Sequence, residues 1–591
     1  MAKRSGSSIA KPAKPAKRQK TTTAPSPSLK QSISPSSSEE CPLPPALPPL
    51  RPHPKSYHRP LLATHPSAAH SLLQWYDATS TTRNMPWRKP FPSASSLPTS
   101  PSEVLALLSR RAYEVWVSEI MLQQTRVSTV IPYFNSWIAK WPEIHALAGA
   151  EHDEVLAAWK GLGYYSRATR LWKGAKMVVG ELGGNIPGTV EGLLKVAGIG
   201  PYTAGAVASI AFGKAVPLVD GNVARVLSRQ VGVFGDMKRR EVDGLVWEVA
   251  REAVEGATRV EMRDRGEEGD MSDVPGRWNQ ALMELGSTVC TPRPKCGECP
   301  IRETCRVYAE GELVVDPSKS HDAKGSALTD IEDACSLCEP LDPEVVEAAC
   351  KGQAAADAQA EAEGENGSKT GKSSQKNSRT AKAKVEKGPK QRSLQDFAFK
   401  GPAAGKKDQQ TVTSDAKAET PLPPKKVPLD EITAYCSLFP KRAVKRQVPE
   451  EDCAVCVFEF KSKLGSYFLI EQRPETGLLA SMWQFPNLAV AKEVDEEEVV
   501  ERAATLAGNY LAERELAHVG EIGCITHVFS HLKLNMHLHL MRIDGAGAIK
   551  PPQPDSASRQ KWVDEKSVDD ATMGTGMKRC WELFKSKQKR K

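Results

Sequence analysis

The chain has no tryptophan, tyrosine or phenylalanine between Tyr308 and Phe397, and this gap limits how many residues can share one hydrophobic core. On its N-terminal side, residues 66 to 308 show helical periodicity and hold nine of the 12 tryptophans. On its C-terminal side, from about residue 446, apolar or alternating runs such as CAVCVFEF indicate strands. Because 591 residues also exceed what one core usually serves, we expect two folded domains joined by a linker.

The sequence divides into four predicted regions. Residues 1–55 are rich in Ser, Pro, Ala and Lys, and residues 311–445 contain a long run of small and polar residues. Neither region can bury enough apolar surface to offset the entropy cost of ordering. We therefore predict a disordered basic tail at 1–55, an all-α domain at 56–310, an interdomain linker at 311–445 and an α+β module at 446–591.

Charge and cysteine content narrow the class of protein. The net charge of +8 is concentrated at the two ends, with seven Lys and Arg in the first 20 residues and KSKQKRK at the end. Such runs suit nuclear import or phosphate contact, although solvated tails have the same composition. No apolar stretch reaches the ~18 residues of a membrane span and no secretory signal is present. We expect a soluble protein of the nucleus, with the mitochondrion as a second possible location, and its thirteen cysteines favour metal ligation over disulfides.

A glycine turn interrupts a helical run at AGIGPY, where Gly198 and Gly200 allow a tight reversal. The turn leaves backbone N–H groups open at the start of the next helix, where an anion such as a nucleic-acid phosphate is favoured. Taken alone, it could also be an ordinary turn between helices. Asp220 follows in VDGNVARVL, and on local pattern alone it could be a simple helix cap.

With further motifs, this pattern resembles the helix-hairpin-helix DNA glycosylases, most closely the adenine DNA glycosylases of the MutY type. The resemblance covers residues 70–310 and, more weakly, 450–590. It is carried by WYD (75–77), PWR (86–88), VWVSEIMLQQT (115–125), GLGYYSRA (161–168), GIGPYTAGA (198–206), VDGNVARVL (219–227) and NQALMELG (279–286). It implies an all-α helix-hairpin-helix catalytic domain with an iron–sulfur loop and a C-terminal α+β domain similar to Nudix (MutT-like) domains.

Two carboxylates fit the cleavage of an N-glycosidic bond, which needs an acid for the leaving base and an anion for the oxocarbenium-like sugar. Glu119 lies in the apolar run VWVSEIML, so burial should raise its pKa and keep it protonated, able to donate a proton to adenine N7. The alternative is that Glu119 is a surface residue of an amphipathic helix. Asp220 should stay ionised at the start of a helix. The resemblance implies these same roles and adds Asn222 to the catalytic residues.

Tyr202 stands where the related endonuclease III type has a lysine that forms a Schiff base with the sugar. A phenol cannot form that imine, so we predict a monofunctional glycosylase in which Tyr202 helps to position Asp220. Lys195 lies on the other arm of the hairpin and is not expected to replace the lysine. A bifunctional glycosylase/lyase and a non-catalytic scaffold that binds mispairs are the alternatives.

Adenine must leave the base stack to reach the catalytic groups. The resemblance implies that Tyr164 wedges beside the opposing base and that Gln124 enters the vacated space. It further implies that Trp87, Arg88, Leu122 and Gln280 line the adenine pocket. For Tyr165 we retain an ordinary core position.

Four cysteines, Cys290, Cys296, Cys299 and Cys305, form a C-x5-C-x2-C-x5-C pattern that suits a [4Fe-4S] cluster or zinc. The resemblance favours the cluster, although the first gap is one residue shorter than is usual in the family. A second pair, Cys335 and Cys338, lies in the predicted linker. By resemblance to animal relatives, this pair could bind zinc with His58 and Cys350, or the thiols could be free.

The C-terminal module lacks the glutamate-rich box of Nudix hydrolases, so nucleotide hydrolysis is disfavoured. The resemblance implies that it recognises 8-oxoguanine through Phe529, Ser530 and His531. We expect LKLNMHLHL to be a half-exposed strand and Cys453 and Cys456 to be ordinary sheet residues.

Gln391, Leu394 and Phe397 have the spacing of a sliding-clamp (PCNA) motif, or form a chance apolar patch. We predict a monomer that excises adenine from A:8-oxoG or A:G mispairs in duplex DNA.

Overall fold

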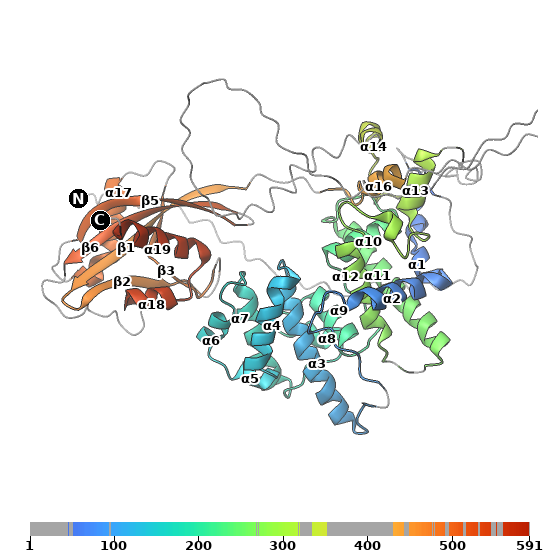
Figure 1. Cartoon of the computed structure of the whole chain (residues 1–591), viewed down its shortest axis with the longest axis horizontal. Helices are drawn as coiled ribbons and strands as arrows, with labels where there is room; N and C mark the ends of the chain where they lie inside the picture. Colours follow the sequence, from blue (N-terminus) through green and yellow to red (C-terminus); the bar gives the residue numbers. More distant parts are fainter. Residues whose placement is uncertain are drawn as a thin grey trace, which may run out of the picture. The chain divides into compact units, whose positions relative to one another are not determined.

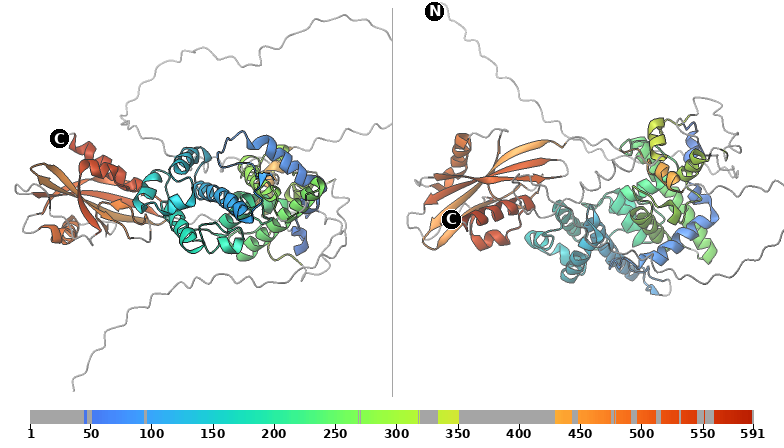
Figure 2. Two further views of the ribbon diagram at one scale, coloured as in Figure 1. Left: turned by 90° about the horizontal axis from the view of Figure 1, so that it is seen from below. Right: turned by 45° about the horizontal axis from the view of Figure 1, so that its top comes forward.

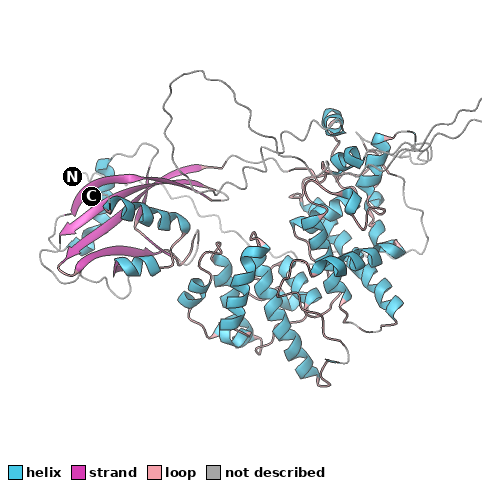
Figure 3. Ribbon diagram, in the orientation of Figure 1, coloured by secondary structure: helices cyan, strands magenta, loops and turns pink. Residues whose placement is uncertain are grey.

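The computed structural model of the chain describes residues 45–46, 51–93, 96–267, 269, 271–316, 318, 334–350, 429–442, 448–474, 477, 479–490, 496–511, 516–529, 532–544, 551 and 559–589. Helices make up the part before residue 320, and the strands of the sheet lie after residue 448 (Figure 3). The two-domain class predicted from the aromatic gap is confirmed. Among the described residues, no helix is both long and apolar enough to cross a membrane.

The first part is a helical domain whose core contains several buried tryptophans. Trp116, Trp137, Trp159 and Trp278 are fully buried, as the helical periodicity of this region predicts. Its helices, labelled in Figure 1, are η1 (Lys55–His58), α1 (Leu61–Thr64), α2 (Pro66–Ser80), α3 (Pro101–Leu122), α4 (Val127–Lys140), α5 (Ile144–Ala148), α6 (His152–Ala158), α7 (Ser166–Glu181), α8 (Val190–Leu193), α9 (Pro201–Ile210), α10 (Gly221–Gln230), α11 (Arg240–Arg265), α12 (Val274–Thr288), η3 (Cys296–Glu298) and α13 (Arg306–Val315).

Glycines allow two close approaches that bring the later helices together. A Cβ at Gly205 of α9 would lie 2.1 Å from the Pro217 carbonyl oxygen, and one at Gly286 of α12 would lie 2.8 Å from Asn222 Cβ. Only a residue without a side chain fits such contacts. As a result, α12 packs directly on the first turn of α10, where Asp220 and Asn222 lie.

The helical domain extends beyond the predicted range of 56–310. Arg51 is buried and forms an ion pair with the buried Glu310 of α13 at 2.7 Å. Tyr57 and Tyr435 donate hydrogen bonds to the same carboxylate, at 2.7 and 2.8 Å. A buried charge needs such partners, so Glu310 ties three distant segments together.

Two helices lie in the range predicted as linker. α14 (Pro343–Cys350) and α16 (Leu429–Cys436) pack with α13 around a small apolar cluster that includes Val307, Ile432 and Phe439. Both helices are short and bury their apolar side chains against α13, which is distant in the sequence. The pattern of residues within the linker therefore does not indicate where they pack.

The C-terminal part is a mixed sheet with helices on both faces, as the two views of Figure 2 show. The strand order β3-β2-β1-β6-β5 places β1 and β6 side by side in parallel, while β4 pairs with β1 and β7 with β2. The elements are β1 (Glu450–Ser462), β2 (Gly465–Gln472), β3 (Trp483–Gln484), β4 (Asn487–Val490), α17 (Glu496–Leu511), β5 (Leu516–Val528), β6 (Lys533–Asp544), β7 (Gln560–Asp564), α18 (Glu565–Asp570) and α19 (Thr575–Gln588).

Alternation along β1 separates the two cores of this domain. Cys453 packs against the face covered by α18 and α19, and Cys456 packs against the face covered by α17. Both cysteines are therefore ordinary sheet residues, as predicted. The expectation of a half-exposed β6 is wrong for His539, which is 1% exposed, because its neighbour on β1, Cys456, belongs to the core covered by α17.

Candidate active site and metal centres

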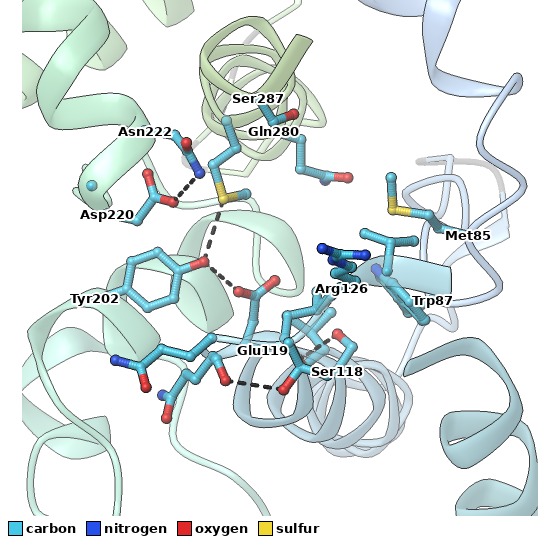
Figure 4. A pocket seen from close by; sticks show the side chains of 18 of the residues that line it. Met85, Trp87, Ser118, Glu119, Arg126, Tyr202, Asp220, Asn222, Gln280 and Ser287 are labelled. Carbon is cyan, nitrogen blue, oxygen red and sulfur yellow. Dashed lines mark hydrogen bonds between the residues drawn. The ribbon is translucent and has the colours of Figure 1, made fainter. Parts of the chain in front are cut away.

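A cavity of about 1150 Å³ opens in the helical domain, and it is lined by residues from α3, α7, α9, α10 and α12. Glu119, Tyr202, Asp220 and Asn222 all lie on its wall (Figure 4). Its size matches or exceeds that of ordinary ligand pockets, which hold roughly 300–1,000 Å³. The structure thus brings together the four residues that the sequence assigned to catalysis.

Glu119 occupies the buried C-terminal half of α3, where every residue from Val115 to Met121 is buried. Its side chain points into the cavity, yet the residue is only 5% exposed. The pKa of Glu119 is raised to about 7, mainly by burial and also by the nearby Asp220, while a hydrogen bond from Tyr202 and the charge of Arg88 oppose the rise. Glu119 can therefore hold a proton near neutral pH.

Tyr202 lies on the first turn of α9, directly after Gly200 and Pro201. Its hydroxyl donates a 2.5 Å hydrogen bond to Glu119 Oε2 and lies 3.3 Å from Met283 Sδ (Figure 4). Burial and the neighbouring Glu119 raise the pKa of Tyr202 well above its ordinary value, so the phenol stays neutral. The expected partner was Asp220, but the hydroxyl contacts Glu119 instead.

Asp220 caps the N-terminus of α10 with one carboxylate oxygen and contacts Asn222 with the other. Oδ1 accepts a bond from the Val223 N–H at 2.7 Å, and Oδ2 accepts one from Asn222 Nδ2 at 2.9 Å. A negative charge is favoured at this end of a helix. Arg225 donates to Asn222 Oδ1 at 2.9 Å and to the Gly286 carbonyl at 2.7 Å, which fixes the Asn222 amide.

The cavity is also lined by the four residues assigned to the adenine pocket, Trp87, Arg88, Leu122 and Gln280. Trp87 is buried edge-on against Phe134, and Gln280 Oε1 accepts a bond from Tyr76 at 2.9 Å. Arg88 Nη1 is buried without a hydrogen-bond partner in the described structure. Such a donor on a cavity wall is suited to an acceptor on a ligand.

Gln124 and Tyr164, assigned to the opened base stack, also line the cavity. Both have left-handed backbone conformations, with φ of 55° and 49°, which non-glycine residues seldom adopt. Tyr164 is 49% exposed, whereas Tyr165 is buried as predicted. Strain of this kind is often found at ligand sites.

The hairpin glycines lie beside a smaller neighbouring cavity and do not line the main one. Gly198 has a φ of +88°, and a Cβ there would lie 2.8 Å from Arg170 Cβ. Gly200 is the N-cap of α9. Open N–H groups at this helix start, with Arg167 and Arg170 nearby, suit an anion.

Cys290, Cys296, Cys299 and Cys305 surround a common small cavity beside α10. Zinc holds its thiolates at about 2.3 Å, so its ligands lie within roughly 4 Å of one another. Among the residues that the structure describes, these four cysteines are not a group that could hold a single metal ion. Four thiols around one cavity are instead the donor set of a [4Fe-4S] cluster.

A second group of possible metal ligands comes from two segments that are distant in the sequence, residues 53–58 and 335–338. Ligand atoms of His53, His58, Cys335 and Cys338 all lie within 4.8 Å of one another. The Nδ1 atoms of His53 and His58 face the carbonyls of Arg51 and Val231, so each Nε2 is left for a metal. His58 Nε2 lies 3.3 Å from Cys335 Sγ and 3.5 Å from Cys338 Sγ. This donor set fits zinc.

The predicted fourth ligand, Cys350, is not part of this group; His53 takes that place. Cys350 ends α14 and packs against the cluster around Leu341 and Ile432. The sequence indicated that a fourth ligand was needed, but it did not show that His53 lies beside His58, Cys335 and Cys338.

The C-terminal domain has its own cavity of about 230 Å³, lined by Phe529 together with Asp452, Arg473 and Trp483. Ser530 and His531, the other residues assigned to 8-oxoguanine, lie outside the described residues. The clamp-motif residues Gln391, Leu394 and Phe397 also lie outside them, as do the first 20 residues with their basic run.

Sequence reasoning missed Glu284, which is 2% exposed on the cavity wall. Its two oxygens accept bonds from Arg83 at 2.9 Å and Arg88 at 2.8 Å. Glu284 follows Gln280 by one helical turn, so the i, i+4 rule could have placed both side chains on one face of α12.

Two family models match the chain. The "HhH-GPD superfamily base excision DNA repair protein" model covers residues 117–252, and the "NUDIX domain" model covers residues 457–583. The first match contains Glu119, Tyr202 and Asp220, and the second spans most of the mixed sheet.

Curated relatives extend these matches over most of the chain. The adenine DNA glycosylase of Homo sapiens is 32% identical over 525 residues, covering 88% of this chain and 74% of the relative. That of Schizosaccharomyces pombe is 29% identical over 480 residues, covering 79% and 80%. Among solved structures, a thermostable thymine-DNA glycosylase matches 40% of this chain and 93% of its own, with 24% identity and a TM-score of 0.31.

Proposed function

The chain belongs to the adenine DNA glycosylase family, and from this premise we propose that it excises adenine paired with 8-oxoguanine or guanine without cleaving the strand. The observation that carries the proposal is the convergence of Glu119, Tyr202 and Asp220 on one cavity wall. Five arginines, Arg83, Arg88, Arg126, Arg167 and Arg170, also line the cavity, which suits a nucleic-acid backbone.

In the proposed mechanism, Glu119 is the general acid. Its carboxyl group is neutral below about pH 7 and donates its proton to adenine N7 as the bond between N9 and C1′ breaks. The electrons of that bond move into the base, which leaves as neutral adenine. The hydrogen bond from the Tyr202 hydroxyl to Glu119 Oε2 fixes the orientation of the carboxyl group that donates the proton.

Asp220 stabilises the positive charge that develops on the sugar. Its carboxylate is oriented by the Val223 N–H and Asn222, both already in place before the reaction, so little reorganisation is needed. Water then adds to C1′ and gives a proton to the Glu119 carboxylate, which restores the acid and leaves an abasic site. No lysine lines the cavity in the described structure, and Lys195 is absent from its wall, which supports base release without an imine intermediate.

The C-terminal domain is proposed to recognise the partner base, 8-oxoguanine, in the cavity beside Phe529. An aromatic ring and polar side chains such as Arg473 and Asp452 are suited to stack on a base and to bond its edge. We further propose a [4Fe-4S] cluster on the four cysteines of 290–305, and zinc on His53, His58, Cys335 and Cys338. In both sites the bound group would hold loops in place, and no reaction step depends on it.

The test is adenine release from a duplex with one A:8-oxoG pair. Glu119→Gln keeps the size of the side chain but carries no transferable acid proton, so release should fall by at least about 10³-fold while duplex binding is retained. Glu103→Gln, an exposed position on the same helix, is the matched control. Borohydride should trap no covalent adduct. Full turnover by Glu119→Gln, or an efficiently trapped adduct, would overturn the proposal.

A further inference from the structure

A fifth cysteine lies at the cavity of the four-cysteine loop. Cys436 is the last residue of α16, is 1% exposed, and lines the same small cavity as Cys290, Cys296, Cys299 and Cys305. None of the motifs discussed above includes it, because it lies near the end of the range predicted as linker, far along the chain from Cys305.

Cys436 is next to one particular member of the loop. Its thiol and that of Cys296 share a hydrogen bond. Cys296 and Cys305 also pack at the edge of the apolar cluster in which Cys436 is buried. A buried cysteine is often only a small apolar residue, but this one faces a cavity whose other sulfurs form a ligand set.

The position of Cys436 is fixed from both sides. The preceding residue, Tyr435, donates a 2.8 Å hydrogen bond to the buried Glu310. Three residues later, the Phe439 carbonyl accepts a 3.0 Å bond from Arg229 Nε, and the same guanidinium donates to the Cys290 and Thr291 carbonyls. Arg229 therefore fixes the position of α16 relative to the cysteine loop.

Two glycines let α16 approach this closely. A Cβ at Gly297, the residue after Cys296, would lie 2.9 Å from Leu429 Cδ2 at the start of α16. A Cβ at Gly311 of α13 would lie 3.0 Å from Ile432 Cγ2. The contact between α16 and the loop is thus built into three separate segments.

We propose that Cys436 is a fifth thiolate of the iron–sulfur site and takes the coordination position of Cys296 when that residue is absent or released. If Cys296 is released, one iron–sulfur bond to Cys296 would break, one to Cys436 would form, and the proton of the Cys436 thiol would pass to the departing Cys296 sulfur. If residue 296 is alanine, Cys436 would bind as the thiolate and give its proton to solvent. Neither case transfers an electron. The proposal rests on the proposed [4Fe-4S] cluster and not on the glycosylase reaction.

The experiment measures iron and acid-labile sulfide per molecule in the full-length protein. Alanine is used because, unlike serine, it cannot bind iron. Cys296→Ala should keep iron and sulfide close to wild type, whereas Cys299→Ala, which leaves the thiol beside Cys436 in place, should lose most of both. The double variant Cys296→Ala/Cys436→Ala should fall at least about tenfold below Cys296→Ala, in the range seen for lost metal-site partners.

Matched controls separate this effect from misfolding. Cys296→Ala/Cys580→Ala removes a second buried cysteine in the C-terminal domain and should behave like Cys296→Ala alone. Zinc content and far-ultraviolet circular dichroism report whether each variant is folded. Loss of iron from Cys296→Ala to the level of Cys299→Ala, or equal iron in the two double variants, would overturn the proposal. A wild-type protein without iron and sulfide would instead overturn the cluster itself.

Discussion

Individual side chains in the cavity derive their chemistry from a few neighbours. Glu119 is shielded by the buried half of α3, so the neutral acid is favoured, while Asp220 is capped by two donors and lies at a helix N-terminus. The two carboxyl groups in one cavity therefore have different surroundings, and such a difference is what lets one carboxyl group act as an acid and another as an anion.

The pH dependence of base release should report the Glu119 proton. The pKa of Glu119 is about 7 and the acid must be protonated, so the single-turnover rate should be flat in mildly acidic buffer and fall about tenfold per pH unit well above 7. Rapid-quench measurement of adenine release between pH 5 and pH 9 checks this. A rate that rises across that range would instead indicate a base at this position.

The raised pKa of Glu119 also predicts how the stability of the folded state changes with pH. Because the pKa of Glu119 in the folded state lies above its ordinary value of 4.5, the folded state binds more protons than the unfolded state between those values. Stability should therefore fall as the pH rises through this window, by about 3 kcal/mol in total. Glu119→Gln should remove that contribution, so urea unfolding at pH 8 should show it more stable than the wild type. Equal stabilities at pH 8 would argue against a buried, ionisable Glu119.

Glu284 is predicted to position the arginines of the adenine pocket. Glu284→Gln keeps the volume but removes the charge that Arg83 and Arg88 share, so both guanidinium groups should lose their orientation. The single-turnover rate should fall roughly 10- to 100-fold, as expected for one lost charged hydrogen bond, while the pH profile keeps its shape. Glu255→Gln, at an exposed pair on α11, should have no effect. A shifted pH midpoint would mean that Glu284 acts on Glu119 instead.

At the scale of elements, α10 connects the cavity to the cysteine loop. Asp220 stands at its N-terminus, and one turn later Arg225 donates both to Asn222 and to the Cys290 carbonyl at 2.9 Å. Arg229 adds a contact to Cys290 Sγ at 3.3 Å. The loop that carries the cysteines therefore supports the helix that presents the catalytic carboxylate.

Close packing of α12 on α10 should be needed for this arrangement. Gly286→Ala would place a Cβ 2.8 to 3.0 Å from the Cβ and backbone of Asn222, and backbone cannot move aside. We expect a loss of about 1–3 kcal/mol in the free energy of unfolding and slower base release, although no catalytic side chain has changed. Gly244→Ala, in α11 with open space around it, is the control and should be neutral or stabilising. The prediction fails if the two variants behave alike.

At the scale of the whole molecule, sequence reasoning indicated the two domains and three residues that line one cavity, because each of these rests on a local pattern. Glu119, Tyr202 and Asp220 each lie in a short segment with its own pattern, and the two domains follow from the distribution of aromatic and alternating residues. It failed where partners are distant along the chain. His53 and Cys436 lie in segments that have no periodicity of their own, and only the packing around α13 brings them to a ligand set. No local pattern carries such long-range information.

The zinc group offers a whole-molecule prediction because its ligands come from segments on either side of the helical domain. Zinc bound to His53, His58, Cys335 and Cys338 would join the N-terminal segment to the segment at 334–338, which already contact each other through the Cys335 N–H and His53 carbonyl at 2.9 Å. Since structural zinc contributes directly to folding free energy, His53→Asn should lower both zinc content and the thermal midpoint.

Comparison of variants decides which residue is the fourth ligand. Cys350→Ser should keep its zinc, because Cys350 is outside the ligand group, and His65→Asn, at an exposed histidine, should behave as wild type. A strong chelator should lower the thermal midpoint of the wild type toward that of His53→Asn and leave the latter unchanged, since an ion that is not bound cannot stabilise the fold. If Cys350→Ser loses zinc and His53→Asn retains it, the ligand set expected from sequence resemblance is right and the one read from the structure is wrong.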